Sequence, residues 1–139
     1  MGPSPSHPAE PLTLQQELPA TVESVSEARH AVRRFAAELD VDLDDVTLAV
    51  SEAVANVVTH AYEADAGGVI ELSGTATPYE VRIIVRDRGH GIAAARPSTG
   101  AGFGIGIIRR LAEHVSLDDS PSGVVLTMRF RRGGRSSAR

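Results

Sequence analysis

Two consecutive stretches of apolar residues at helical spacing restrict the folds open to this chain more than any other feature. They predict one helix from about residue 22 to near residue 40 and a second over 42–62. Asp42 is expected to cap the second helix. Asp44 and Asp45 follow in its first turn, where acidic groups suit the positive end of the helix dipole.

The segments around these helices have the character of strands. A loosely alternating run ends at Pro19, which predicts a strand at the edge of a sheet, and Gly67–Gly68 breaks the chain before the next pair of strands. A third helix is expected over 102–115. The predicted strands are 12–18, 69–76, 80–86, 116–119 and 124–130. This order predicts a two-layer α/β sandwich, with a mixed sheet and helices on one face.

Composition limits the domain organisation. The chain has 139 residues, which is enough for one domain with a real core. Residues 1–11 are rich in Pro and Ser and are expected to form a disordered leader, while 131–139 is expected to be a flexible basic tail. The domain is therefore assigned to residues 12–130.

Composition also excludes several classes of function. The absence of cysteine excludes disulfides and cysteine-based metal sites. The net charge of −4, with no basic stripe before the tail, gives no reason to expect direct nucleic-acid binding. No apolar run reaches bilayer length and the N-terminus lacks a secretory pattern, so we expect a cytoplasmic protein that does not enter a membrane.

All 14 basic residues are arginine, so the chain contains no lysine. A P-loop requires a lysine that reaches the β- and γ-phosphates, and a eukaryotic-type protein kinase requires a strand lysine on the phosphates. Both of these nucleotide sites are excluded by composition alone.

Three motifs could carry chemistry, and the first is a polar pair on the second helix. Glu52 and Asn56 are four positions apart, so they share one helix face. The pair can be a solvated polar stripe. Alternatively it can be a site in which the carboxylate is a general base and the amide oxygen is a ligand for Mg²⁺.

The second motif follows the predicted strand 80–86. Asp87 lies at the end of that strand, where its carboxylate can accept a hydrogen bond from an exocyclic amine such as that of adenine. Gly89 and Gly91 would let the backbone approach a flat ligand. A plain Asp-x-Gly turn explains the same residues.

The third motif is the glycine-rich start of the predicted third helix. It consists of Gly102, Phe103, Gly104, Ile105 and Gly106. Glycines at this position leave backbone N–H groups accessible to an anion. Close packing of the helix on the sheet would also select glycine. A Rossmann site does not fit, because the third glycine falls one position early and no βα unit precedes the motif.

In this order and spacing the three motifs resemble the GHKL ATPase superfamily, the gyrase and histidine-kinase type of nucleotide site. The stretch Ser51-Glu-Ala-Val-Ala-Asn-Val-Val-Thr-His-Ala-Tyr62 is similar to that of the bacterial anti-sigma factor serine kinases, the switch kinases of partner-switching modules. The resemblance covers residues 12–130, which is nearly the whole predicted domain.

The resemblance implies a role for each motif residue. It implies that Glu52 is the base that prepares a serine hydroxyl of a partner protein, and that Asn56 holds Mg²⁺ against the phosphates of ATP. Asp87 would read the adenine amine, with Gly89 and Gly91 shaping the pocket. The glycine-rich segment 102–106 would cradle the phosphates. Thr127 is the candidate for a late-strand threonine that supports the adenine water network, although an ordinary strand threonine remains an alternative.

The resemblance also implies the partners. These are a sigma factor, which is held inactive, and an anti-sigma factor antagonist that carries the target serine; a homodimer is expected. The short loop 92–101 offers only Arg96 for a terminal phosphate, and a solvated loop arginine is an equal interpretation. The alternative function is therefore a nucleotide-binding regulatory module that binds partner proteins without phosphorylating them.

Overall fold

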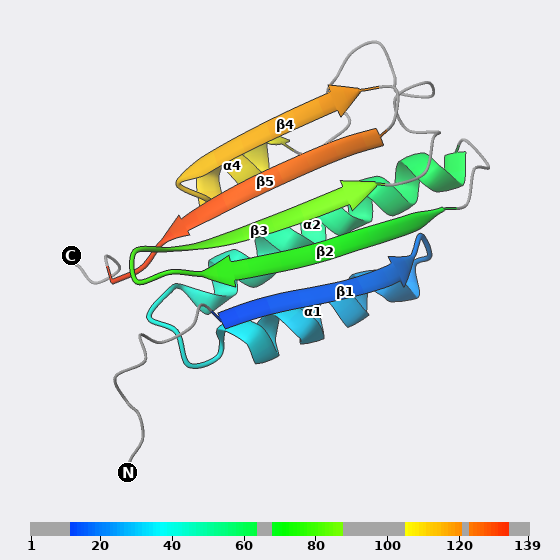
Figure 1. Cartoon of the computed structure of the whole chain (residues 1–139). Helices are drawn as coiled ribbons and strands as arrows, with labels where there is room; N and C mark the ends of the chain where they lie inside the picture. The colour runs from blue at the N-terminus through cyan, green and yellow to red at the C-terminus, as the bar shows by residue number, and fades with distance from the viewer. Residues whose placement is uncertain (1–11, 64–67, 88–104, 121–122, 134–139) are drawn as a thin grey trace.

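The structure is a computed structural model that describes residues 12–63, 68–87, 105–120 and 123–133, with the backbone alone for 60–63, 119 and 120. Figure 1 labels its elements along the chain. They are β1 (Leu12–Pro19), α1 (Glu23–Ala36), α2 (Leu43–Glu63), β2 (Val69–Ala76), β3 (Glu80–Asp87), α4 (Ile105–Leu111), β4 (His114–Ser120) and β5 (Gly123–Arg131).

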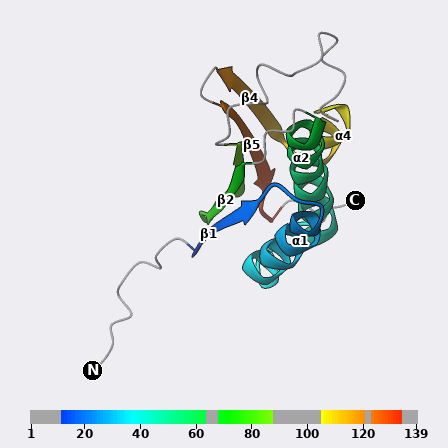
Figure 2. The same cartoon turned by 90° about the vertical axis from the view of Figure 1, so that its right-hand side faces the viewer.

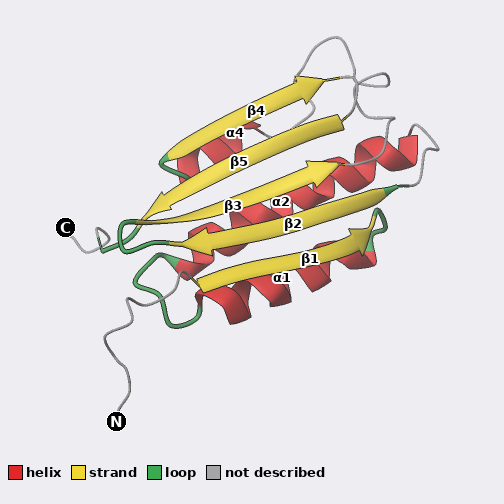
Figure 3. Ribbon diagram, in the orientation of Figure 1, coloured by secondary structure: helices red, strands yellow, loops and turns green. Residues whose placement is uncertain are grey.

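The described strands form one five-stranded sheet in the order β1-β2-β3-β5-β4. Figure 2 shows α1, α2 and α4 on the same side of this sheet, and Figure 3 shows the helices behind the strands. The predicted two-layer α/β sandwich is therefore confirmed. β1 lies at a sheet edge, as Pro19 indicated, because the edge is where a residue without an N–H is tolerated.

The direction of the strands differs from the expectation of a mixed sheet. All four described strand pairs are antiparallel. α1 and α2 together return the chain to the end of the sheet at which β1 finished, so β2 runs back along β1. β4 runs in the same direction as β3, so the two strands would form a parallel pair if they were neighbours. They are not neighbours, because β5 lies between them and pairs antiparallel with each.

The first helix ends earlier than predicted, at Ala36 instead of near Asp40. Asp40 is used to join two distant parts of the chain. Its carbonyl accepts the Gly133 N–H at 2.9 Å, and its Oδ1 accepts the Arg132 Nε–H at 2.6 Å. Arg132 also donates to the carbonyl of Thr77 at 2.7 Å. These contacts fix the α1–α2 connection and the β2–β3 turn to the end of β5, and a longer α1 would break them.

The last helix also ends earlier than predicted, at Leu111 instead of Val115. The backbone after it is recruited by the sheet, because the Glu113 N–H donates to the Arg129 carbonyl at 2.8 Å and Val115 lies opposite Met128. Pairing with β5 satisfies these backbone groups in a way that excludes further helix. The predicted start at Gly102 lies outside the described residues.

The core fills the layer between the sheet and the helices. Alternate residues of β2, β3 and β5 face this layer and are buried, as the period of a strand requires. Phe35 of α1 packs onto β2 at Gly74, where an added Cβ would lie 3.0 Å from Phe35 Cε2 and 3.1 Å from Ile83 Cδ1. The glycine is therefore required for α1 to approach the sheet.

Replacing Gly74 with valine is expected to lower the free energy of unfolding by about 1–3 kcal/mol, because the branched side chain would overfill this contact. Denaturant unfolding measures the change. Ser73→Val is the matched control, since the same side chain then lies on the outward face of the same strand and should have little effect. Equal losses in the two variants would contradict the packing argument.

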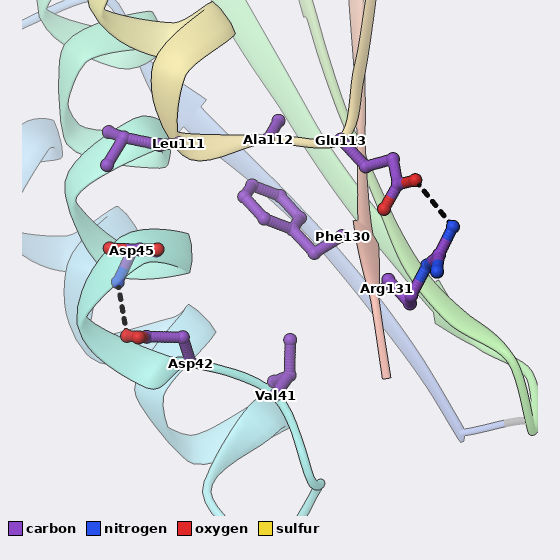
Figure 4. Close-up of a pocket in the computed structure, with 8 residues that line it drawn as sticks. All are labelled: Val41, Asp42, Asp45, Leu111, Ala112, Glu113, Phe130 and Arg131. Carbon is purple, nitrogen blue, oxygen red and sulfur yellow. Dashed lines mark hydrogen bonds and ion pairs between the residues drawn. The ribbon is translucent and has the colours of Figure 1, made fainter. Parts of the chain in front are cut away.

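The predicted cap of α2 is confirmed. The Asp45 N–H donates to Asp42 Oδ1 at 3.0 Å, and Figure 4 shows this hydrogen bond. The same first turn concentrates negative charge. Burial, followed by repulsion from Asp42 and Asp44, raises the pKa of Asp45 above its ordinary value of 3.8. The folded chain thus binds this proton more tightly than the unfolded chain, and the stability that Asp45 contributes falls as pH rises above 3.8.

Two substitutions of Asp42 should separate capping from charge. Asp42→Ala removes the acceptor and is expected to lower the free energy of unfolding by about 1 kcal/mol at neutral pH. Asp42→Asn keeps an acceptor and removes a charge that raises the pKa of Asp45, so its stability should stay within about 0.5 kcal/mol of the wild type. Thermal unfolding at neutral pH checks both, and an Asn variant as unstable as the Ala variant would contradict the assignment.

Candidate functional site

Asp87 is the last residue of β3, and its side chain faces the layer between the sheet and the helices. Only 3% of its surface is exposed. The alternation of β3 places Val81, Ile83 and Val85 on the same side, so the carboxylate continues a row of buried apolar residues. A carboxylate that is buried at the end of a strand offers a strong and selective hydrogen-bond acceptor in apolar surroundings, which makes this position a candidate site.

Asn56 lies against the same region from the opposite layer. It lines a small cavity between α2 and the sheet, together with Val85 and Val124. Val85 precedes Asp87 on the buried side of β3, and Val124 is the cross-strand partner of Asp87 in β5. The remaining lining residues are Ala53, Val57, Ile105, Leu117 and Leu126. The structure thus places Asn56 at an apolar cavity whose wall includes the neighbours of Asp87 along β3 and across to β5, although Asp87 itself does not line it.

Glu52 lies one helical turn before Asn56 on α2 and is half-buried. The spacing puts both side chains on one face of the helix. Glu52 does not line the cavity. This arrangement leaves a carboxylate beside the cavity, where a group arriving from outside can reach it.

The helix α4 contributes the next part of the site. Ile105, its first residue, lines the cavity, and Gly106 follows it on the exposed side. An added Cβ at Gly106 would meet no heavy atom within 4 Å beyond its own helical turn. Close packing of the helix on the sheet, one of the two explanations for these glycines, therefore does not account for Gly106.

Several predicted site residues lie outside the described residues. They are Gly89, Gly91, Gly102, Phe103 and Gly104, together with Arg96 of the loop. Their predicted roles remain predictions.

Thr127 lies apart from this group, and its predicted role in the adenine water network stays a prediction. In β5 the buried positions are Val124, Leu126 and Met128, and Thr127 lies between them on the outward face of the sheet. The residue of β5 that lies opposite Asp87 is Val124. The spacing of β5 already contained this information, because Thr127 is an odd number of positions from Val124 and the two side chains must point to opposite faces.

Two larger concavities lie at the other end of the sheet, where β3 begins. One, of about 490 Å³, is drawn in Figure 4, with Asp42 and Asp45 on one side of Phe130 and the Glu113–Arg131 ion pair on the other. The second, of about 500 Å³, adjoins it on the strand side and shares Glu113 and Arg131. Neither contains a predicted site residue. We assign the candidate site to Asp87 and not to either concavity, because a buried carboxylate discriminates among ligands more strongly than the volume of a concavity does.

In the described part of the chain, no helix has both the length and the hydropathy that a membrane crossing requires.

Comparison with known families supports the resemblance that the motifs carry. Residues 18–130 match the model of the histidine kinase-like ATPase domain. That span includes the three described helices, β2, β3, β4, all of β5 except Arg131, the last two residues of β1, and every predicted site residue.

Similar proteins and a solved structure agree with this match. The chain is 33% identical to an anti-sigma F factor of Bacillus subtilis over 119 residues, which cover 76% of this chain and 82% of that protein. It is 34% identical to the serine-protein kinase RsbW of Halalkalibacterium halodurans, covering 86% of this chain and 83% of that one. The structure of the RsbU and RsbW domains of Rv1364c from Mycobacterium tuberculosis superposes with a TM-score of 0.66 at 23% identity, over 91% of this chain and 34% of that one, and so supports the fold. The chain belongs to the histidine kinase-like ATPase domain family, and its relatives include anti-sigma factors and serine-protein kinases.

Proposed function

We infer that this chain is an Mg-ATP-dependent serine-protein kinase and anti-sigma factor, which phosphorylates a serine of an anti-sigma factor antagonist and sequesters a sigma factor. One observation carries the inference: the amide of Asn56 lines an apolar cavity between the two layers of an ATPase fold, and the buried carboxylate of Asp87 neighbours two of the residues that line it, Val85 and Val124. The names of its relatives, anti-sigma F factor and serine-protein kinase, point to the same activity.

Asp87 is the proposed reader of adenine. Its carboxylate accepts a hydrogen bond from the exocyclic amine, and the apolar walls at Val85 and Val124 suit the faces and edges of a base. Gly89 and Gly91 let the following backbone come close to the ring. Thr127 lies on the other face of β5, so the adenine pocket is proposed to consist of Asp87 and its apolar neighbours among the described residues.

Asn56 is the proposed ligand of Mg²⁺. A side-chain amide oxygen is a hard donor of the kind that Mg²⁺ accepts, and its position at the cavity fits a metal held between α2 and the phosphates of a nucleotide. When bound, Mg²⁺ supplies charge neutralisation of the phosphate oxygens. Backbone N–H groups of the segment from Gly102 through Phe103, Gly104 and Ile105 to Gly106 are proposed to hold those oxygens.

Glu52 is the proposed general base. It lies one turn from Asn56 and outside the cavity, so a serine hydroxyl of a partner protein can reach it while the base of the nucleotide is buried. Its role is to accept the hydroxyl proton as the oxygen attacks the terminal phosphoryl group. Positioning and charge stabilisation supply most of the remaining catalysis in such transfers.

The proposal includes several statements about the whole protein. The catalytic domain is proposed to begin at residue 12 and to extend past the expected boundary at residue 130. Arg131 is the last residue of β5 and Arg132 is hydrogen-bonded to Asp40 and Thr77, which corrects the expectation of a flexible tail from residue 131. The protein acts in the cytoplasm as a homodimer, with a sigma factor and an antagonist as its two partners. A monomeric mass by light scattering at micromolar concentration would exclude the homodimer.

A glycine substitution in α4 tests the phosphate-binding segment. Gly106→Ala is expected to raise the free energy of unfolding by up to about 1 kcal/mol, because alanine favours a helix and meets no neighbour. The same variant should bind ATP about tenfold more weakly, since the methyl group obstructs the approach of phosphate to the backbone. Thermal unfolding and calorimetric titration measure the two effects, and unchanged ATP affinity would exclude Gly106 from the site.

Transfer of labelled γ-phosphate to a candidate antagonist domain tests the proposed function directly. The wild type should label the intact antagonist and should not label the same antagonist with its target serine replaced by alanine. ATP binding without transfer to any serine-bearing antagonist would instead support a regulatory module that binds its partners without phosphorylating them.

A further inference from the structure

The outward face of the sheet, which the helices do not cover, has an unusual arrangement of charge. Arg82 of β3 lies opposite Arg129 of β5, and Arg129 lies opposite His114 of β4. Three basic side chains thus stand side by side across three neighbouring strands. Like charges directly opposite each other destabilise a sheet, so the fold alone does not explain this row.

The nearby carboxylate of Glu80 does not form a close ion pair with either arginine of this row. Glu80 Oε2 is 3.6 Å from Arg82 and 3.9 Å from Arg129, so one oxygen is shared by two guanidinium groups and neither distance is that of a hydrogen bond. Both arginine side chains remain 44% exposed. By contrast, Arg131 next to them is held by Glu113 at 2.8 Å.

The row borders a concavity of about 500 Å³ that includes His114, Arg129 and Arg131. Tyr79 also lines it and is 79% exposed, which is high for an aromatic residue. Arginine and tyrosine are the residue types enriched at the energetic centres of protein interfaces. On the other side the row continues into two hydroxyl groups, because Thr75 lies opposite Arg82 and Thr13 lies opposite Thr75.

We propose that this surface, formed by Arg82, Arg129, His114 and the adjoining concavity at Tyr79, binds an acidic segment of a partner protein in an extended conformation. It lies at the other end of β3 from Asp87, so it is separate from the nucleotide site and does not depend on that site's function. A carboxylate of the partner that lies between Arg82 and Arg129 attracts both guanidinium groups and so offsets the repulsion between them. Acidic residues at alternate positions of an extended segment present carboxylates about 7 Å apart, which guanidinium groups on neighbouring strands can reach.

Charge favours a protein segment over a nucleic acid. The chain carries a net charge of −4, and Glu80 and Glu113 flank the arginines. A continuous polyphosphate would be repelled by these acids, whereas a segment with a few spaced carboxylates can avoid them.

The test measures fluorescence anisotropy of a labelled peptide of alternating glutamate and serine against the full chain, at low and at physiological ionic strength. The matched probes are a peptide with glutamine in place of glutamate and a single-stranded oligonucleotide of equal charge. We expect the wild type to bind the glutamate peptide most tightly, with an affinity that falls as salt rises. Absence of binding by the glutamate peptide, or equal or tighter binding by either other probe, would overturn the proposal.

Variants assign the binding to this surface. Arg129→Glu should weaken peptide binding about tenfold or more, because it reverses the central charge of the row. Arg86→Glu is the control, since Arg86 lies on the same face and pairs with Glu71 at 3.8 Å but lies outside the row. Arg129→Ala should lose binding with an unchanged or higher melting temperature, because it removes repulsion from Arg82. Equal peptide affinities for Arg129→Glu and Arg86→Glu would contradict the assignment. A lowered melting temperature in Arg129→Ala would also contradict it, because the loss of peptide binding could then be explained by a loss of folded protein.

Discussion

The Asp87→Asn variant is expected to bind ATP about 100-fold more weakly than the wild type, as measured by calorimetric titration. Asparagine has the same shape, but in place of one carboxylate oxygen it presents an N–H₂ group, which cannot accept from the adenine amine. A hydrogen bond to a charged group contributes about 1.5–3 kcal/mol, and about 1.4 kcal/mol corresponds to a factor of ten in affinity. The burial of Asp87 places the loss at the upper end of that range.

The control for this prediction is Asp118→Asn, which makes the same change on the exposed face of β4. It should leave ATP affinity within about twofold of the wild type, since it removes only a solvated charge. Thermal unfolding of both variants shows whether the fold is intact. An Asp87→Asn variant that is folded and binds ATP normally would show that adenine is recognised elsewhere.

Replacing Glu52 with alanine is expected to reduce phosphate transfer to the antagonist by about 100-fold and to leave ATP binding unchanged. Loss of a positioned general base lowers the rate of proton transfer by about 10²–10⁴-fold. ATP affinity should be preserved because Glu52, unlike Asn56, does not line the cavity between α2 and the sheet. Single-turnover transfer of labelled phosphate, alongside calorimetry, separates the two effects.

Glu38→Ala is the matched control for Glu52→Ala, because Glu38 is exposed in the connection after α1. It should transfer phosphate at the wild-type rate. Equal rates for wild type and Glu52→Ala would remove the general-base role and favour a mechanism in which positioning alone activates the serine.

The sequence predicted the layers of this fold and most of its element positions, because these depend on periodicity within short segments. Helical spacing located α2 and its cap at Asp42, and strand alternation located β2 and β3. The sequence pattern did not predict the residues at which α1 and α4 end. Those ends are decided by contacts between distant segments, namely Arg132 with Asp40 and Glu113 with Arg129.

The site was predictable to a similar degree. Local motifs predict Asp87 and Asn56, and the structure places Asn56 at a cavity lined by Val85 and Val124, the neighbours of Asp87. Thr127 was selected by residue type without regard to the face of β5, and the structure places Val124 opposite Asp87 instead. The apolar wall that includes Leu117 and Leu126 depends on which strands are neighbours. The order in which β5 separates β3 from β4 is a property of the folded chain that no single segment specifies.

Calorimetric titration of ATP, with and without Mg²⁺, on the wild type and on Asn56→Ala tests the central claim most directly. We expect Mg²⁺ to tighten ATP binding by the wild type, and we expect Asn56→Ala to retain the weaker, metal-independent binding but to lose this gain. The nucleotide site would then be established at the junction of α2 and the sheet. If the wild type binds no ATP, or if Mg²⁺ has the same effect on both proteins, the site proposed at Asn56 and Asp87 is contradicted.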